Sequence, residues 1–78
     1  MSPVARGKPV KLSELKSGSV VVVTHQNECL AAGARKRVRV DATGLWVRCE
    51  NGKHYLDAHE PAEGLPLAGF ELLEKGAE

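Results

Sequence analysis

Four residues of this 78-residue chain have the chemistry to bind a metal ion: two cysteines and two of the three histidines. His25 lies four residues before Cys29, and His54 lies five residues after Cys49. Paired zinc ligands usually lie about two to four residues apart within one turn, whereas Cys49 and His54 flank a complete predicted hairpin. The spacing therefore favours Cys49 as a small core residue and His54 as its cross-strand neighbour. We predict no metal and no other cofactor, and a Cys₂His₂ site on these four residues is the alternative.

The same thiols are the candidates for nucleophilic catalysis. Such catalysis needs a base beside the thiol and a third group that orients the base. Cys49 and His54 are within reach across the predicted hairpin, but Asp57 falls on the opposite strand face from His54 and cannot orient it. A core of this size also leaves little room for an enclosed pocket, and no glycine cluster between a strand and a helix is present to hold phosphate. We predict that the protein is not an enzyme.

A second group of residues combines aromatic rings with positive charge on that hairpin. The Asn51-Gly52 dipeptide predicts a type I′ turn, because both central residues of this turn need positive φ. The resulting cross-strand pairs are Cys49–His54, Arg48–Tyr55, Val47–Leu56 and Trp46–Asp57. Alternation along the strands predicts an inner face of Val38, Val40, Leu45, Val47, Cys49 and Leu56. The predicted outer face consists of Arg35, Arg37, Arg39, Trp46, Arg48, Lys53 and Tyr55.

The predicted outer face has the chemistry of a nucleic-acid interface. Flat rings stack on unpaired bases with about 1–3 kcal/mol per base, while guanidinium groups neutralise phosphates and make cation–π contacts. We predict that Trp46 and Tyr55 stack on bases of single-stranded or structured nucleic acid, without strong sequence reading. Two alternatives remain: Trp46 packs under a neighbouring segment in a purely structural role, or the face or a strand edge binds another protein, as in a small regulator or inhibitor.

The distribution of charge agrees with a polyanionic partner. The net charge is only +1, but residues 1–53 hold ten Lys or Arg against four acids, which gives +6, and residues 54–78 hold one Lys against six acids, which gives −5. Two cysteines are too few for a disulfide framework, and neither a cleavable leader nor a membrane-spanning apolar run is recognisable. We therefore expect a cytoplasmic protein without membrane association, as a monomer or a homodimer.

The elements that must position these residues are short. Residues 1–9 contain prolines, glycine and basic residues without apolar periodicity, so we expect a flexible basic arm, followed by one domain over 10–74 and a flexible tail over 75–78. Leu12 and Leu15 followed by Gly18 indicate one helical turn. The four valines from Val20 to Val23 predict a central strand covered on both faces.

Further strands are expected at 35–40, 45–50, 53–57 and 70–73, separated by turn-forming segments and by a long connection over 59–69. Five short strands with one N-terminal helical turn predict an all-β fold, either a small five-stranded barrel or a strongly bent antiparallel sheet. The entry segment Leu12–Gly18, which leads into Val20–Thr24 and then into tight hairpins, resembles the layout of an SH3-like barrel over about residues 11–74. This resemblance is architectural and implies a fold without a particular function.

Overall fold

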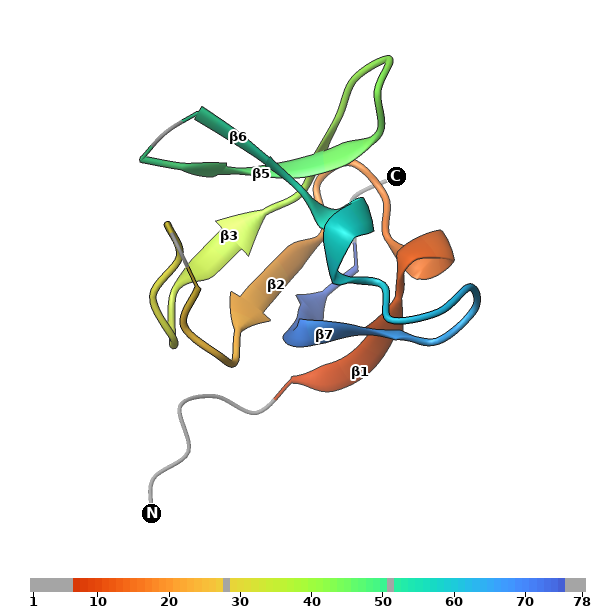
Figure 1. Cartoon of the computed structure of the whole chain (residues 1–78), viewed down its shortest axis with the longest axis horizontal. Helices are drawn as coiled ribbons and strands as arrows, with labels where there is room; N and C mark the ends of the chain where they lie inside the picture. Colours follow the sequence, from red (N-terminus) through yellow and green to blue (C-terminus); the bar gives the residue numbers. More distant parts are fainter. Residues whose placement is uncertain (1–6, 28, 51, 76–78) are drawn as a thin grey trace.

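The computed structural model describes residues 7–27, 29–50 and 52–75, and it shows an all-β fold. Seven strands and two short 3₁₀ helices lie within these residues, and the strands form two antiparallel sheets rather than one closed barrel (Figure 1). The elements are β1 (Lys8–Lys11), η1 (Leu12–Glu14), β2 (Val20–Val23), β3 (Arg35–Arg37), β4 (Arg39–Val40), β5 (Leu45–Cys49), β6 (Gly52–Tyr55), η2 (Leu56–His59) and β7 (Pro66–Glu74). The prediction of an all-β fold is confirmed, whereas the prediction of five strands is wrong.

The first sheet has the strand order β1-β7-β2-β3, which places β2 in its interior. Val21, Val22 and Val23 have no exposed surface. A run of β-branched residues suits a strand that is covered on both faces, because the stiff side chains pack well on a pleated surface. The predicted central strand is therefore confirmed.

The edge strand β1 begins earlier in the chain than the sequence indicates. Lys8 and Pro9 lie in β1 opposite Leu72 and Glu71 of β7, although both were expected in the flexible arm. Proline fits here because an edge strand does not need every backbone N–H for pairing. Val10 follows and is 1% exposed, so β1 contributes to the core. Residues 1–6 of the expected arm and 76–78 of the expected tail lie outside the described residues.

The last strand is also longer than expected. β7 starts at Pro66, inside the segment 59–69 that was predicted to be a connection, and runs for nine residues. Pro66 is tolerated as the first residue of the strand, and Gly69 adopts a φ of +87° that lets the strand bend. Pro and Gly therefore mark the start and a bend of this strand rather than a loop.

The chain crosses from the first sheet to the second at Val38. The predicted strand 35–40 is divided, because β3 pairs with β2 whereas β4 pairs with β5. The buried Val38 between them donates its N–H to the Ser19 carbonyl at 2.7 Å and accepts from the Gly18 N–H at 2.8 Å. Beyond this corner the side chain of Val40 is 54% exposed, so its predicted place in the core is wrong.

The second sheet has the order β4-β5-β6, and its hairpin register differs from the predicted one by two residues. Cys49 pairs with Gly52, so Gly52 belongs to β6 rather than to the centre of a turn, and Asn51 lies outside the described residues. The observed pairs are Trp46–Tyr55, Val47–His54, Arg48–Lys53 and Cys49–Gly52. A shift of two residues leaves every side chain on its predicted face, which is why the apolar pattern could not distinguish the two registers.

The two sheets enclose one core between them (Figure 1). Its buried members come from both sheets, from η2 and from the η1–β2, β2–β3 and β3–β4 connections: Val10, Leu15, Val21, Val23, Leu30, Val38, Val47, Leu56, Leu67 and Phe70. Leu45 and Cys49 are partly buried against it, as their predicted inner face requires. Among the described residues, neither 3₁₀ helix nor any other helix has the length and apolar character to span a bilayer.

The burial of Val10 predicts that β1 is an integral part of the domain. Val10→Ala removes two methyl groups from the core and should lower the free energy of unfolding by roughly 2 kcal/mol. Val40→Ala, at the exposed strand position, is the matched control and should cost about 0.5 kcal/mol or less. Urea titrations followed by Trp46 fluorescence measure both values, and equal losses for the two variants would contradict the docking of β1.

Candidate functional site

Five of the seven predicted outer residues share one face of the second sheet. Arg39 and Tyr55 both lie directly opposite Trp46, on the two strands that flank β5. Arg48 lies directly opposite Lys53 in the next row of the same face. Residues that oppose one another in an antiparallel pair point to the same side of the sheet. We refer to Arg39, Trp46, Arg48, Lys53 and Tyr55 as the basic-aromatic face.

The other two predicted residues belong to the first sheet. Arg35 lies opposite Val22 and Arg37 lies opposite Val20. The Arg37 guanidinium also donates a long hydrogen bond of 3.4 Å to the Gly18 carbonyl. Both residues precede the corner at Val38. Their predicted placement beside the aromatic rings is wrong, because it treated residues 35–40 as one strand.

Asp41 anchors the basic-aromatic face, and the sequence had indicated only a turn at this position. Its Oδ2 accepts hydrogen bonds from Tyr55 Oη at 2.6 Å and from Lys53 Nζ at 2.7 Å. Its Oδ1 accepts from the backbone N–H groups of Thr43 at 2.8 Å and Gly44 at 3.1 Å. Aspartate at the first position of a turn commonly binds the backbone N–H two residues later, so the turn sequence was the available signal. The contacts of Asp41 with Lys53 and Tyr55 on β6 leave no signal in the sequence, because they depend on how the strands are arranged.

The same hydrogen bonds set the charge state of this face. The bonds from Lys53 and then Tyr55 hold the pKa of Asp41 well below its usual range. In return, the bond to Asp41 raises the pKa of Lys53 and that of Tyr55. At neutral pH the group therefore consists of a carboxylate, an ammonium and a neutral phenol. The positive charge of Lys53 is largely offset, so among the described residues of the face Arg39 and Arg48 carry the charge that no ion pair compensates.

Trp46 is half-buried rather than sealed in the core. The Lys53 ammonium lies 4.8 Å from the centroid of its ring, within the range of a cation–π contact. The indole Nε1 is buried and has no hydrogen-bond partner among the described residues. A buried N–H without a partner costs free energy, so a ligand or a rearrangement that supplied an acceptor would be favoured.

A cluster of thiols and imidazoles lies on the inner side of the same hairpin. Cys29 from the β2–β3 loop, Cys49 at the end of β5 and His54 on β6 bring their ligand atoms within 4.8 Å of one another. Cys29 Sγ lies 3.4 Å from His54 Nδ1. We refer to these three residues as the thiol–imidazole cluster. His25, the fourth residue of the sequence-based set, lies apart from it and contacts the Thr24 hydroxyl through Nδ1 at 3.0 Å.

His59 also lies beside the cluster, although it was not among the residues predicted from the sequence. Its Nε2 lies 2.7 Å from His54 Nε2, and its ring packs edge-on against Phe70 with 4.8 Å between centroids. The sequence placed His59 at the start of a long connection, whereas η2 brings it back over the core. A second histidine five residues after His54 was the only signal available in the sequence.

The hydrogen bonds of His59 determine which nitrogens carry protons. Burial lowers the pKa of His59, a charge on His54 lowers it further, and a backbone hydrogen bond with Ala68 acts in the opposite direction. We assign the neutral tautomer in which His59 Nδ1–H donates to the Ala68 backbone and Nε2 accepts from His54 Nε2–H, because it satisfies both contacts. In this tautomer His54 Nδ1 has a lone pair that accepts from the Cys29 thiol.

No family model, curated protein or solved structure matches this chain. A function must therefore be inferred from the two groups of residues described above. The basic-aromatic face lies on the outer side of the β5–β6 hairpin, and Cys49 and His54 of the thiol–imidazole cluster lie on its inner side.

The depressed pKa of Asp41 predicts a specific loss of stability in acid. In the unfolded chain an aspartate carboxyl has a pKa of about 3.9. The contribution of Asp41 to the free energy of unfolding is therefore present above that pH and is lost as the pH falls toward the lower pKa of the folded state. In Asp41→Asn the free energy of unfolding should fall less steeply between about pH 4 and pH 2 than in the wild type. Glu63→Gln, which changes an exposed loop carboxylate, is the control. A slope for Asp41→Asn that is parallel to the wild type would contradict the anchoring role.

Proposed function

We propose that this chain is a small, non-enzymatic nucleic-acid-binding module that uses the basic-aromatic face. The observation that carries the proposal is the row formed by Arg39, Trp46 and Tyr55 across three strands, in which two flat rings lie beside an exposed guanidinium. Interfaces for unpaired nucleic acid combine these two chemistries, because rings hold bases and cations hold the phosphate backbone. We propose an SH3-like arrangement and a cytoplasmic location as the setting for this function.

Stacking on this face requires the Lys53 side chain to leave the Trp46 ring. The same Nζ is bonded to Asp41 at 2.7 Å, so this ion pair must rearrange when the ring is uncovered. The cost is small, because exposed ion pairs contribute little to stability. The released indole face is large and flat, and its stacking partner must be a base that is not already stacked in a duplex. The ligand class is therefore single-stranded RNA or DNA, or an unpaired loop of a structured nucleic acid.

The phosphate contacts are assigned to Arg39 and Arg48. Both side chains are exposed: Arg39 lies opposite Trp46 on β4, and Arg48 lies in the next row of the face, on β5 itself. Lys53 contributes less net charge because Asp41 offsets it at 2.7 Å. Arg35 and Arg37 lie in the other sheet and add only to the general positive potential.

A protein partner is the second candidate, and the exposed apolar residues favour it. Val40 is 54% exposed and Leu65 is 49% exposed. Trp, Tyr and Arg also dominate the central contacts of protein interfaces. Salt distinguishes the two candidates, because binding driven by phosphates weakens steeply with salt and an aromatic protein interface does not.

If nucleic acid binds to the basic-aromatic face, removal of a cation from this face should weaken binding more than removal of a cation from the other sheet. Labelled homopolymer RNA and single-stranded DNA are titrated with the purified chain at two or more salt concentrations, with fluorescence anisotropy as the readout. Arg39→Gln and Arg48→Gln should each weaken binding and reduce the slope of log K against log salt by about 0.7. Arg35→Gln removes the same charge from the other sheet and should leave the slope nearly unchanged.

The stacking contact is tested separately with Trp46→Ala. Loss of one stacked base, worth about 1–3 kcal/mol, should weaken binding about 5- to 150-fold at constant salt. Circular dichroism must show that the variant remains folded, and Trp46→Phe should recover part of the affinity because it restores a flat ring. The proposal is wrong if the wild type binds neither polymer at low salt, or if Arg35→Gln and Arg48→Gln are equally impaired.

A further inference from the structure

The thiol–imidazole cluster gathers three good ligands for a soft or borderline metal ion from separate parts of the chain. Cys29, Cys49 and His54 are 20 and 5 residues apart in sequence, yet all three ligand atoms lie within 4.8 Å of one another. Two thiolates with one imidazole are a ligand set typical of zinc. We propose that Cys29, Cys49 and His54 bind one Zn²⁺ ion, which joins the β2–β3 loop to the β5–β6 hairpin.

The distances between ligand atoms are close to those of a tetrahedral site. Bonds of about 2.3 Å to sulfur and about 2.0–2.1 Å to nitrogen place tetrahedral ligand atoms about 3.6–3.8 Å apart. Cys29 Sγ and His54 Nδ1 are already 3.4 Å apart. The largest separation in the cluster is 4.8 Å at most, so closure around the ion needs a movement of about 1 Å, within the reach of cysteine χ1 rotation.

The second imidazole is placed to orient the first. A histidine that ligates a metal usually donates its other ring N–H to a nearby acceptor, which fixes its tautomer and its direction. In the assigned tautomer His54 donates Nε2–H to His59 Nε2 at 2.7 Å, and its Nδ1 lone pair is on the side of the Cys29 thiol. His59 is in turn held by the edge-on contact with Phe70. His59 is therefore a positioning residue for the site and not a ligand.

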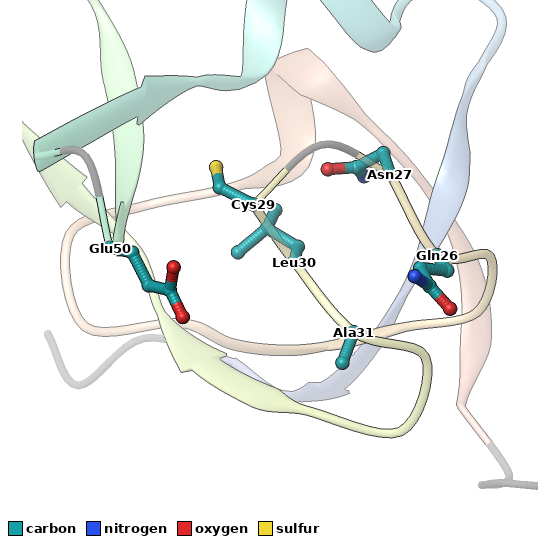
Figure 2. Close-up of a pocket in the computed structure, with 6 residues that line it drawn as sticks. All are labelled: Gln26, Asn27, Cys29, Leu30, Ala31 and Glu50. Atoms are coloured by element: carbon teal, nitrogen blue, oxygen red, sulfur yellow. The ribbon is translucent and has the colours of Figure 1, made fainter.

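A shallow pocket of about 170 Å³ borders Cys29, one of the three proposed ligands. Gln26, Asn27, Leu30, Ala31 and Glu50 form the rest of its lining, and Figure 2 shows the Cys29 sulfur beneath the β5–β6 hairpin with the Glu50 carboxylate across the pocket. The buried Asn27 Oδ1 has no hydrogen-bond partner among the described residues. Space and polar groups are thus present for a water molecule as the fourth ligand, as in sites with three protein ligands.

Proton release accompanies the binding step. The two thiols lose their protons to solvent when the two zinc–sulfur bonds form, whereas His54 Nδ1 already carries a lone pair. The ion then crosslinks two segments of a 78-residue chain, a size at which natural domains often need a metal or a disulfide to supplement the core. The proposal is independent of nucleic-acid binding, because the aromatic rings lie on the other side of the hairpin.

Cobalt is the spectroscopic probe for this site. The full chain is treated with a chelator, kept reduced with a phosphine, and titrated with Co²⁺ and then with Zn²⁺. We expect one Co²⁺ per chain, a thiolate-to-cobalt charge-transfer band with the visible bands of tetrahedral cobalt, and displacement of both by Zn²⁺. Zn²⁺ should also raise the melting temperature of the wild type, because it binds only the folded chain tightly.

Single substitutions distinguish ligands from positioning residues. Cys29→Ser and Cys49→Ser should each remove about half of the thiolate band and abolish the rise in melting temperature with Zn²⁺. His59→Gln retains all three ligands and the cobalt bands but should weaken affinity about 10- to 100-fold. His25→Gln is the matched control, since His25 lies outside the cluster and should bind as the wild type does.

Two results would overturn the proposal. One is the lack of a thiolate-to-cobalt band in the reduced wild type. The other is a His25→Gln variant that loses as much affinity as His54→Gln, which would mean that the ion binds elsewhere. If a cysteine variant fails to fold without metal, the His59→Gln affinity and the wild-type spectrum still decide the question, because both are measured on chains with intact ligands.

Discussion

Side-chain alternation on the β5–β6 hairpin is the constraint on which both proposed sites depend. Val47 has no exposed surface, so the residues on its side of the sheet must face the core and their neighbours must face outward. Cys49 and His54 accordingly lie inside, while Trp46 and Tyr55 lie outside. A register that exposed Val47 would disrupt both the basic-aromatic face and the thiol–imidazole cluster. The free-energy cost of exposing the apolar residues excludes such a register.

Asp41 shows how a turn residue can organise a surface. Its carboxylate satisfies two backbone N–H groups of the β4–β5 turn and also holds Lys53 and Tyr55 on β6. The turn and the far strand of the sheet are therefore tied together through one side chain. The same contacts reduce the net charge of the face, so its positive potential depends mainly on the two arginines beside Trp46.

The sequence predicted the faces better than the connections. The valine run and the alternation around Val47 identified the central strand and the two sides of the hairpin, because burial alone determines them. It could not predict the corner at Val38, since alternation continues unbroken through residues 35–40 while the backbone changes sheets. It also missed His59, whose position depends on η2 and on packing against Phe70. Such contacts between distant segments leave no periodic signal.

The two sites share strands, so a substitution on one side of the hairpin can act on both. His54 lies between Lys53 and Tyr55 in the chain, and Cys49 follows Arg48, so a change on one side of the hairpin alters the backbone that carries the other. A fall in nucleic-acid affinity after His54→Gln would therefore not show that His54 touches the ligand. Because an ionic contact changes the salt slope and a thiolate changes the cobalt spectrum, each site has a readout that backbone displacement cannot imitate.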